Sequence, residues 1–206
     1  MRFSSKGFEV HPSAALNQLT KRHVVFNINC LPSTHAIIRD EMVGICPDTD
    51  GFNQKVSELI TQTCEKTRYK DLCISTLETF AGSNQDDLPG LAKRALKVTS
   101  LHGGEVHDKL IAFYNQTEDE SVRQCLTDCS ENYQDAIDQL EDSLAALDAK
   151  NYNDLNLWTS AAMADAELCE EGFKDRDDIK SPITEINEAF KQMCTICLDI
   201  IKELAK

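Results

Sequence analysis

Residues 117–147, with the sequence TEDESVRQCLTDCSENYQDAIDQLEDSLAAL, are the stretch that decides the fold. Apolar side chains recur there every three or four residues, the spacing that places them on one face of an α-helix. Thr117 and Glu120 have the spacing of a capping box, so we expect the helix to start there. The stretch therefore predicts one long amphipathic helix. Its apolar face consists of Val122, Cys125, Leu126, Cys129, Tyr133, Ala136, Ile137, Leu140, Leu144 and Leu147.

A long helix is also predicted before this stretch, over about residues 88–114. Asp87 can cap it, and Pro89 is tolerated in its first turn. Gly103 and Gly104 should weaken it midway, so we expect a kink or a local break there. The apolar stripe is Leu88, Leu91, Ala95, Val98, Leu110, Ile111 and Tyr114.

Two more long helices are predicted after it. One runs from about residue 154 to 173, with Trp158, Ala161, Ala162, Asp165, Cys169 and Phe173 in register. The other opens with Ser181 as cap and Pro182 as first helical residue and continues to Leu204. Because short links join long amphipathic helices, neighbours should be antiparallel. The chain is predicted to be all-α, an up-down-up-down four-helix bundle.

The sequence predicts two domains of unequal order. Residues 1–50 show no sustained helical or strand period and contain Pro12, Pro32 and Pro47, so we expect a poorly ordered N-terminal extension. Residues 51–206 form the helical domain, with a short helical hairpin over 51–82 and the bundle over 86–206. The hairpin is indicated by Val56, Leu59 and Ile60 at helical spacing and by a second segment from Asp71 to Phe80.

Charge excludes several classes of partner. The net charge is −14, and residues 1–50 are neutral overall, so the whole excess lies in 51–206. A domain this acidic repels phosphate backbones and anionic lipid surfaces, so we expect no nucleic acid and no membrane insertion. No stretch approaches the roughly 20 apolar residues that span a bilayer, and the first residues lack the apolar core of a secretory signal.

Three motifs, in this order, resemble the plant invertase and pectin methylesterase inhibitors over roughly residues 51–206. The first is Thr63-Cys64 followed by Asp71-Leu72-Cys73. The second is the stretch from Asp128 to Ile137, with the spacing Cys-x-x-x-Tyr-x-x-Ala. The third is Trp158-Thr159-Ser160-Ala161-Ala162 followed by Cys169-Glu170-Glu171-Gly172-Phe173.

This resemblance implies a disulfide-stapled inhibitor without catalytic activity or cofactor. It implies the disulfides Cys64–Cys73 and Cys129–Cys169, and one-to-one complexes over the active-site cleft of an invertase, a glycoside hydrolase, or of a pectin methylesterase. It also implies an extracellular location, in the apoplast or cell wall, or a vacuolar one. Disulfides are indeed typical of oxidising compartments.

The target is expected to bind at the turn between the second and third long helices. Some invertase inhibitors carry Pro-Lys-Phe at this turn, whereas this chain has Lys150, Asn151 and Tyr152. The runs 169–174 and 181–183 resemble a subgroup described as invertase inhibitors, some of which are also known as pollen allergens. The resemblance therefore favours acid invertase as the target, with pectin methylesterase as the alternative.

Competing chemistries are weaker on sequence grounds. Cys194 and Cys197 have redox spacing but lie on a helix stripe, which favours buried core thiols. A zinc site would need Cys125 and Cys129 with His102 or His107, and catalysis would need Ser160, His107 and Asp108 to meet; we expect neither. Cys30 and Cys46 are left either to pair with each other or to stay free.

Two questions stay open at the level of sequence. Asn115-Gln116-Thr117 is a glycosylation sequon at a predicted surface link, so Asn115 is a predicted glycan site.

The functional alternatives of other classes are a non-inhibitory storage, structural or defence bundle, and a small-ligand carrier with an apolar cavity between its helices.

Overall fold

A computed structural model of the chain describes residues 49–79, 87–174 and 180–206, which belong to one compact unit, Cys46–Lys206. The predicted N-terminal extension lies almost wholly outside the described residues. The helices in the described residues are α1 (Thr49–Cys64), α2 (Lys70–Glu78), α3 (Leu88–Gln116), α4 (Glu120–Asp148), α5 (Tyr152–Lys174) and α6 (Thr184–Leu204).

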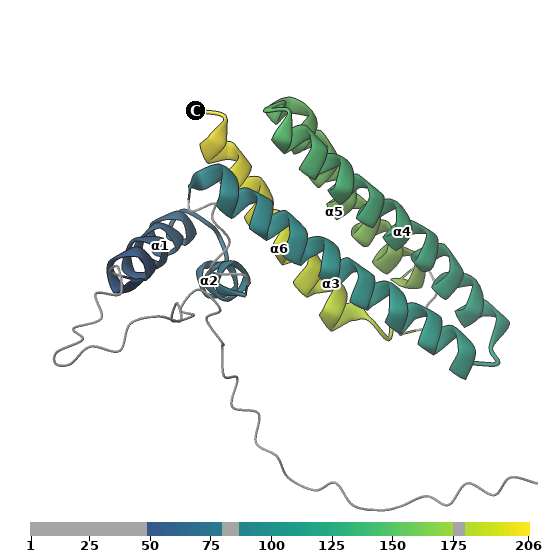
Figure 1. Ribbon diagram of the computed structural model, residues 1–206. Helices are drawn as coiled ribbons and strands as arrows, with labels where there is room; N and C mark the ends of the chain where they lie inside the picture. The colour runs from purple at the N-terminus through teal and green to yellow at the C-terminus, as the bar shows by residue number, and fades with distance from the viewer. Residues whose placement is uncertain (1–48, 80–86, 175–179) are drawn as a thin grey trace, which may run out of the picture. The chain divides into compact units, whose positions relative to one another are not determined.

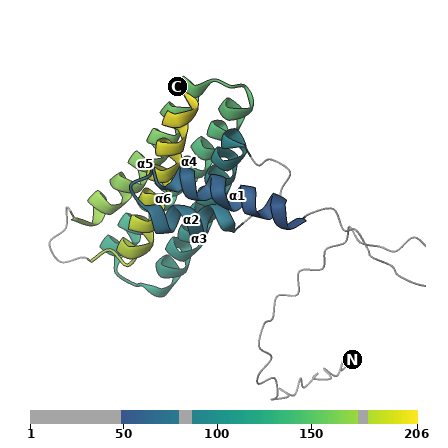
Figure 2. The ribbon, with the colours of Figure 1, turned by 90° about the vertical axis from the view of Figure 1, so that its left-hand side faces the viewer.

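The four long helices α3 to α6 form the predicted bundle. Each packs against two neighbours, in the cyclic order α3, α4, α5, α6. Figures 1 and 2 show them side by side, with the α4–α5 turn at the same end as the C-terminus. The described ranges contain helices and no strand, so the all-α prediction is confirmed.

Two of the predicted helix starts were wrong: a nearer polar side chain caps α4, and the N-cap of α6 is Ile183, which makes no side-chain cap bond. The N-cap of α4 is Asp119, whose Oδ1 accepts from the backbone N–H groups of Ser121 (2.8 Å) and Val122 (3.1 Å). Thr117 instead ends α3, donating its own N–H to Phe113 O. At α6, Ser181 Oγ accepts from Ile183 N–H in a turn that precedes the helix, so α6 starts at Thr184.

The predicted break at Gly103 and Gly104 was also wrong. α3 is continuous from Leu88 to Gln116. A Cβ at Gly103 would lie 3.0 Å from the Phe190 ring and 3.2 Å from Ile137 Cγ1, whereas one at Gly104 would meet nothing within 4 Å. Gly103 is therefore the place where α3 comes close to α4 and α6.

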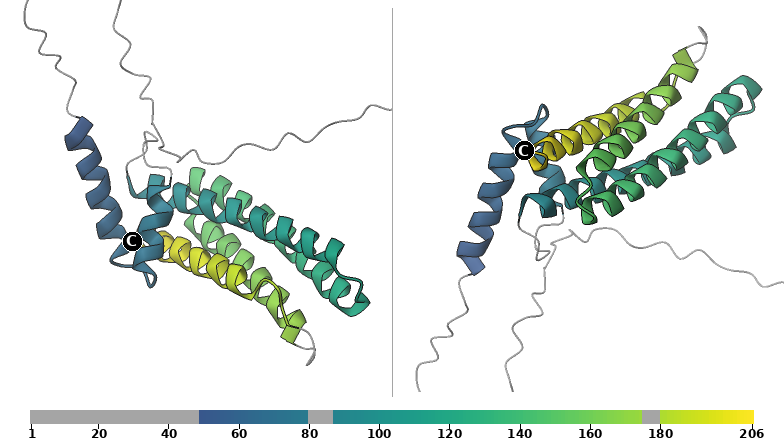
Figure 3. Two further views of the ribbon diagram at one scale, coloured as in Figure 1. Left: turned by 90° about the horizontal axis from the view of Figure 1, so that it is seen from below. Right: turned by 90° about the horizontal axis from the view of Figure 1, so that it is seen from above.

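The short hairpin packs at the end of the bundle formed by the start of α3 and the end of α6 (Figure 3). The disulfide Cys64–Cys73 joins α1 to α2, with the Cα atoms 5.5 Å apart. Arg94 Nη1 of α3 donates to Leu77 O of α2 at 3.0 Å, and Asp199 of α6 accepts from Arg68 N–H at 3.1 Å. The hairpin is thus attached to both neighbouring helices.

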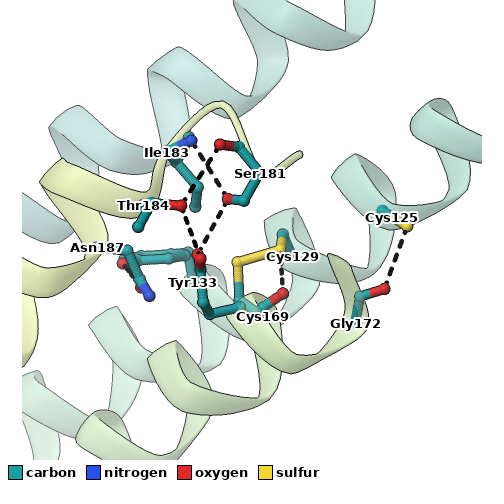
Figure 4. The surroundings of a disulfide bond; sticks show 10 residues. Cys125, Cys129, Tyr133, Cys169, Gly172, Ser181, Ile183, Thr184 and Asn187 are labelled. Atoms are coloured by element: carbon teal, nitrogen blue, oxygen red, sulfur yellow. Dashed lines mark hydrogen bonds between the residues drawn. A yellow bond between two sulfur atoms is a disulfide. The ribbon is translucent and has the colours of Figure 1, made fainter. Parts of the chain in front are cut away.

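The second disulfide, Cys129–Cys169, crosslinks α4 and α5 (Figure 4). Both predicted disulfides are therefore confirmed. Near it, the buried Tyr133 hydroxyl donates to Asn187 Oδ1 at 2.6 Å, and the Tyr133 ring meets Phe190 edge to face at 5.2 Å. These contacts fix α4 against α6. The expectations for Cys30 and Cys46 lie outside the described residues.

Candidate functional site

The predicted target-binding residues lie on the tight turn that joins α4 to α5. Lys150 N–H donates to Leu147 O at 3.0 Å, and Asn151 N–H donates to Ala146 O at 2.9 Å. This pair of bonds is a Schellman motif, which satisfies the last carbonyls of α4 and reverses the chain in very few residues. The turn therefore presents Lys150, Asn151 and Tyr152 together at one end of the bundle.

Lys150 occupies the left-handed position of this motif, with φ of 57°. Glycine usually fills that position, because a side chain there costs about 1–2 kcal/mol. The Lys150 side chain is exposed, and the ion pairs found among the described residues do not include it. A strained lysine with a free ammonium group is the kind of outlier that marks a functional position.

The polar groups of Asn151 already form hydrogen bonds within the first turn of α5. Its Oδ1 accepts from Asp154 N–H at 3.4 Å, its Nδ2 donates to Asp154 Oδ2 at 2.5 Å, and its carbonyl accepts from Leu155 N–H at 3.0 Å. Asn151 is therefore the N-cap of α5. It positions its two neighbours, and its side chain has little capacity left for a partner.

Tyr152 is half-buried and packs against the core while lining two surface hollows. One, of about 180 Å³, lies toward α3 and is lined by Asp87, Lys93 and Asp148 among others. The other, of about 410 Å³, lies toward α6 and is lined by polar residues together with Leu198 and Ile201. Charged side chains line both hollows, which distinguishes them from the apolar cavity that a ligand carrier would need.

One side of α4 carries a row of exposed carboxylates. Only Asp148 among them has an ion pair within the described residues, to Lys93 of α3 at 2.7 Å. Within the described ranges, Lys150 is therefore a cation without an ion pair just beyond the tip of an acidic helix. The exposed acids of this row are Asp128, Glu131, Asp135, Asp138, Glu141, Asp142 and Asp148.

The competing sites do not assemble. Cys129 is taken by its disulfide, and the parts of the chain that the structure describes contain no group of three side chains able to hold a metal ion. Burial raises the pKa of Cys194 well above its ordinary value and that of Cys197 to about 12, so both are protonated thiols of the core. His107 and Asp108 lie on α3, which packs against α4 and α6, whereas Ser160 lies on α5.

Asn115 is exposed in the last turn of α3, and Thr117 follows the end of that helix. This end of α3 is opposite the α4–α5 turn (Figure 1). A glycan on Asn115 would therefore be remote from the candidate site. No helix within the described ranges is long and apolar enough to span a bilayer.

Comparison with known proteins fits this architecture. Residues 58–200 match the family model described as plant invertase/pectin methylesterase inhibitor. The chain belongs to this family. The family model describes inhibitors of these enzymes, so the chain is an inhibitor of an invertase or of a pectin methylesterase.

Relatives of both kinds are found. A pectinesterase inhibitor of Actinidia deliciosa is 31% identical over 144 residues, covering 70% of this chain and 78% of that protein. A protein of Platanus acerifolia named "Putative invertase inhibitor" is 29% identical over 154 residues, covering 72% and 86%. A crystal structure of a mutant pectin methylesterase inhibitor from Arabidopsis matches with a TM-score of 0.60 and 25% identity, covering 69% of this chain and 95% of that one.

The structure brings the three predicted residues of this inhibitor together but gives them different roles. The sequence does not reveal that Lys150 is left-handed, because a lysine at that position carries no turn signal. The cap was accessible in principle, since Asn151 precedes Asp154 by the three residues typical of a capping pair.

Proposed function

We propose that the chain inhibits an acid invertase, binding one-to-one over the active-site cleft with the α4–α5 turn inserted into it. The observation that carries this proposal is Lys150, exposed and left-handed at the tip of a turn fixed by four backbone bonds at its two ends. A rigid turn loses little conformational freedom on binding. Nothing in the fold requires lysine here, so its side chain is available for a partner.

Charge favours a glycoside hydrolase as this partner. Such enzymes hold a pair of Asp or Glu side chains around the scissile bond, most often at the bottom of a cleft. An ammonium group carried into the cleft would be attracted by that pair, and the desolvated contact would be stronger than one on an open surface. Lys150 has no ion pair to break among the residues that the structure describes.

Tyr152 supplies the apolar part of the contact. Aromatic side chains that bury their exposed part on binding are frequent centres of binding energy. Tyr152 is already held by the core on one side, so it is ordered before it meets the enzyme. The two residues form a combined cationic and aromatic tip.

A pectin methylesterase is the second candidate target. It is favoured by the 31% identity to the Actinidia inhibitor and by the matching Arabidopsis inhibitor structure. A non-inhibitory bundle, of the storage or defence kind, is the alternative of another class.

The test is a set of variants of the oxidised chain titrated against both enzymes at mildly acidic pH. Lys150→Ala and Tyr152→Ala should each raise the inhibition constant for invertase by at least about tenfold. Lys174→Ala is the matched control, because Lys174 is exposed at the opposite end of α5. Unchanged inhibition by both tip variants would refute the proposed contact, even if the wild-type chain inhibits.

A further inference from the structure

A carboxyl group and a carboxamide meet between α4 and α5 in an incomplete contact. Asp165 lies on α5, next to the Gln139 side chain of α4. Gln139 Oε1 and Asp165 Oδ2 are nevertheless both fully buried, and neither has a hydrogen-bond donor among the residues that the structure describes. Two buried acceptors without a donor are unfavourable, because each has lost water and gained nothing.

A single proton on Asp165 would give both of these buried oxygens a hydrogen bond. A neutral carboxyl group has one O–H donor and keeps a carbonyl acceptor, and a carboxamide has the complementary pair. With the proton on Asp165 Oδ2, that oxygen can donate to Gln139 Oε1 while the Gln139 NH₂ donates to Asp165 Oδ1. Rotating the Gln139 amide by 180° instead would only exchange which atom lacks a partner.

The surrounding charges also oppose ionisation of Asp165. α5 packs against α4 and α6. On α4 the nearby charged groups are Asp135 and, one turn from Gln139 on the same face, Asp142, both acidic. The basic residues of α6 are Lys191 and Lys202. The Lys191 ammonium group lies 3.8 Å from Glu167 and 3.5 Å from Glu188, and Lys202 lies in the last turn of the helix.

We propose that Asp165 takes up a proton under mildly acidic conditions and that the resulting acid–amide pair with Gln139 fastens α4 to α5. These helices are the two arms of the turn that carries Lys150 and Tyr152. The consequence for inhibition rests on the proposed function: the turn is held most firmly in an acidic compartment. The proton site itself does not depend on which enzyme is bound.

The direction of the pKa shift agrees with this geometry. Burial, and next the Asp135 charge, raise the pKa of Asp165, while the Gln139 hydrogen bond opposes them, and the net change is upward. A pKa that is higher in the folded than in the unfolded state adds stability below the unfolded value, about 4 for aspartate. That stability is lost as the pH rises through the folded pKa.

The experiment is a ¹³C NMR titration of the carboxyl groups of the whole oxidised chain between about pH 3 and pH 8. Asp165→Asn assigns the Asp165 signal by its disappearance. The Asp165 midpoint should lie above the ordinary value of about 4, and the Gln139 side-chain amide signals should move with the same midpoint. Asp135→Asn should lower that midpoint. An Asp165 midpoint at or below the ordinary value would overturn the proposal, and so would Gln139 amide signals that do not shift with that midpoint.

Melting curves give a second readout, because Asn at position 165 can form the same reciprocal pair with Gln139 at every pH. The melting temperature of Asp165→Asn should exceed that of the wild type by about 2–4 °C near neutral pH and converge with it in acid. Glu171→Gln, an exposed carboxylate on α5, is the matched control and should show no such convergence. A constant difference across the pH range would contradict the proton pair. Because neither readout involves an enzyme, failure here is distinct from failure of the proposed function.

Discussion

At the scale of single residues, Lys150 is a position where the residue that suits the fold best differs from the residue that the proposed contact needs. The fold would accept glycine at this left-handed position more readily than lysine. The lysine therefore reduces stability slightly, and the proposed contact with the target explains why it is there.

Lys150→Gly should raise the free energy of unfolding by about 1 kcal/mol, because it removes the strain of a side chain at positive φ. The same variant should inhibit less well, because the ammonium group is gone. Urea denaturation and inhibition titrations of one preparation measure both quantities. A variant that is less stable than the wild type would show that Lys150 contributes to the turn itself.

Asn115 is the second residue whose role is testable in isolation. Its exposure, and its distance from the α4–α5 turn, place a glycan where it would not obstruct binding. Expression of the chain through a plant secretory pathway should add a glycan mass that Asn115→Gln and Thr117→Ala both abolish, with inhibition unchanged. An unmodified secreted chain would contradict the predicted site.

At the scale of helices, Gly103 and Gly104 have opposite roles although they are adjacent. A side chain at Gly103 would press against the Phe190 ring, which is fully buried and packed against Tyr133, so it cannot easily move. Gly104 faces open space. Of these two glycines, only Gly103 therefore lies at the close contact of α3 with α4 and α6.

Gly103→Ala should destabilise the chain by about 1–2 kcal/mol, since the crowding exceeds the gain in helix propensity. Gly104→Ala should stabilise it by up to about 1 kcal/mol, since only the propensity changes. Thermal denaturation of the two variants is a matched comparison. Equal effects of one sign would mean that α3 does not approach α6 closely at Gly103.

The Cys129–Cys169 crosslink acts on the α4–α5 pair, the arms of the candidate turn. Replacing both cysteines by alanine should lower the free energy of unfolding by about 4 kcal/mol, because the loop closed by this bond is long. Guanidinium denaturation under non-reducing conditions measures the loss. Reduction of the wild type opens both disulfides, so it should lower the free energy of unfolding by more than this variant does. A loss from the variant no larger than that from removing Cys64–Cys73 would contradict the loop argument.

At the scale of the whole molecule, the periodicity in the sequence predicts the long helices and their order well. The stripe of residues 117–147 predicts α4 from its period alone, and the disulfides followed from the family resemblance. Helix ends were less predictable, because Thr117, Asp119 and Ser181 all have side chains able to cap, and only the local geometry selects among them. The break expected at Gly103 was wrong, because a glycine that interrupts a helix and one that admits a neighbour look alike in sequence.

The candidate site was predictable in position but not in mechanism. The turn follows from where two helical patterns end, whereas the strain at Lys150 and the capping by Asn151 depend on backbone geometry. Asp165 was grouped with the apolar stripe of its helix. A carboxylate at such a position is a signal that becomes interpretable only once its neighbour Gln139 is known.

The most direct test of the inhibitor assignment and its proposed target is a parallel titration of acid invertase and pectin methylesterase with the oxidised chain at mildly acidic pH. We predict that invertase activity falls linearly to an end point at one chain per enzyme and that pectin methylesterase activity is unaffected. Inhibition of pectin methylesterase alone would contradict the proposed target while leaving the family function intact. Full activity of both enzymes, with both disulfides shown to be present by mass spectrometry, would contradict inhibition of these two enzymes and favour a bundle without an enzyme target.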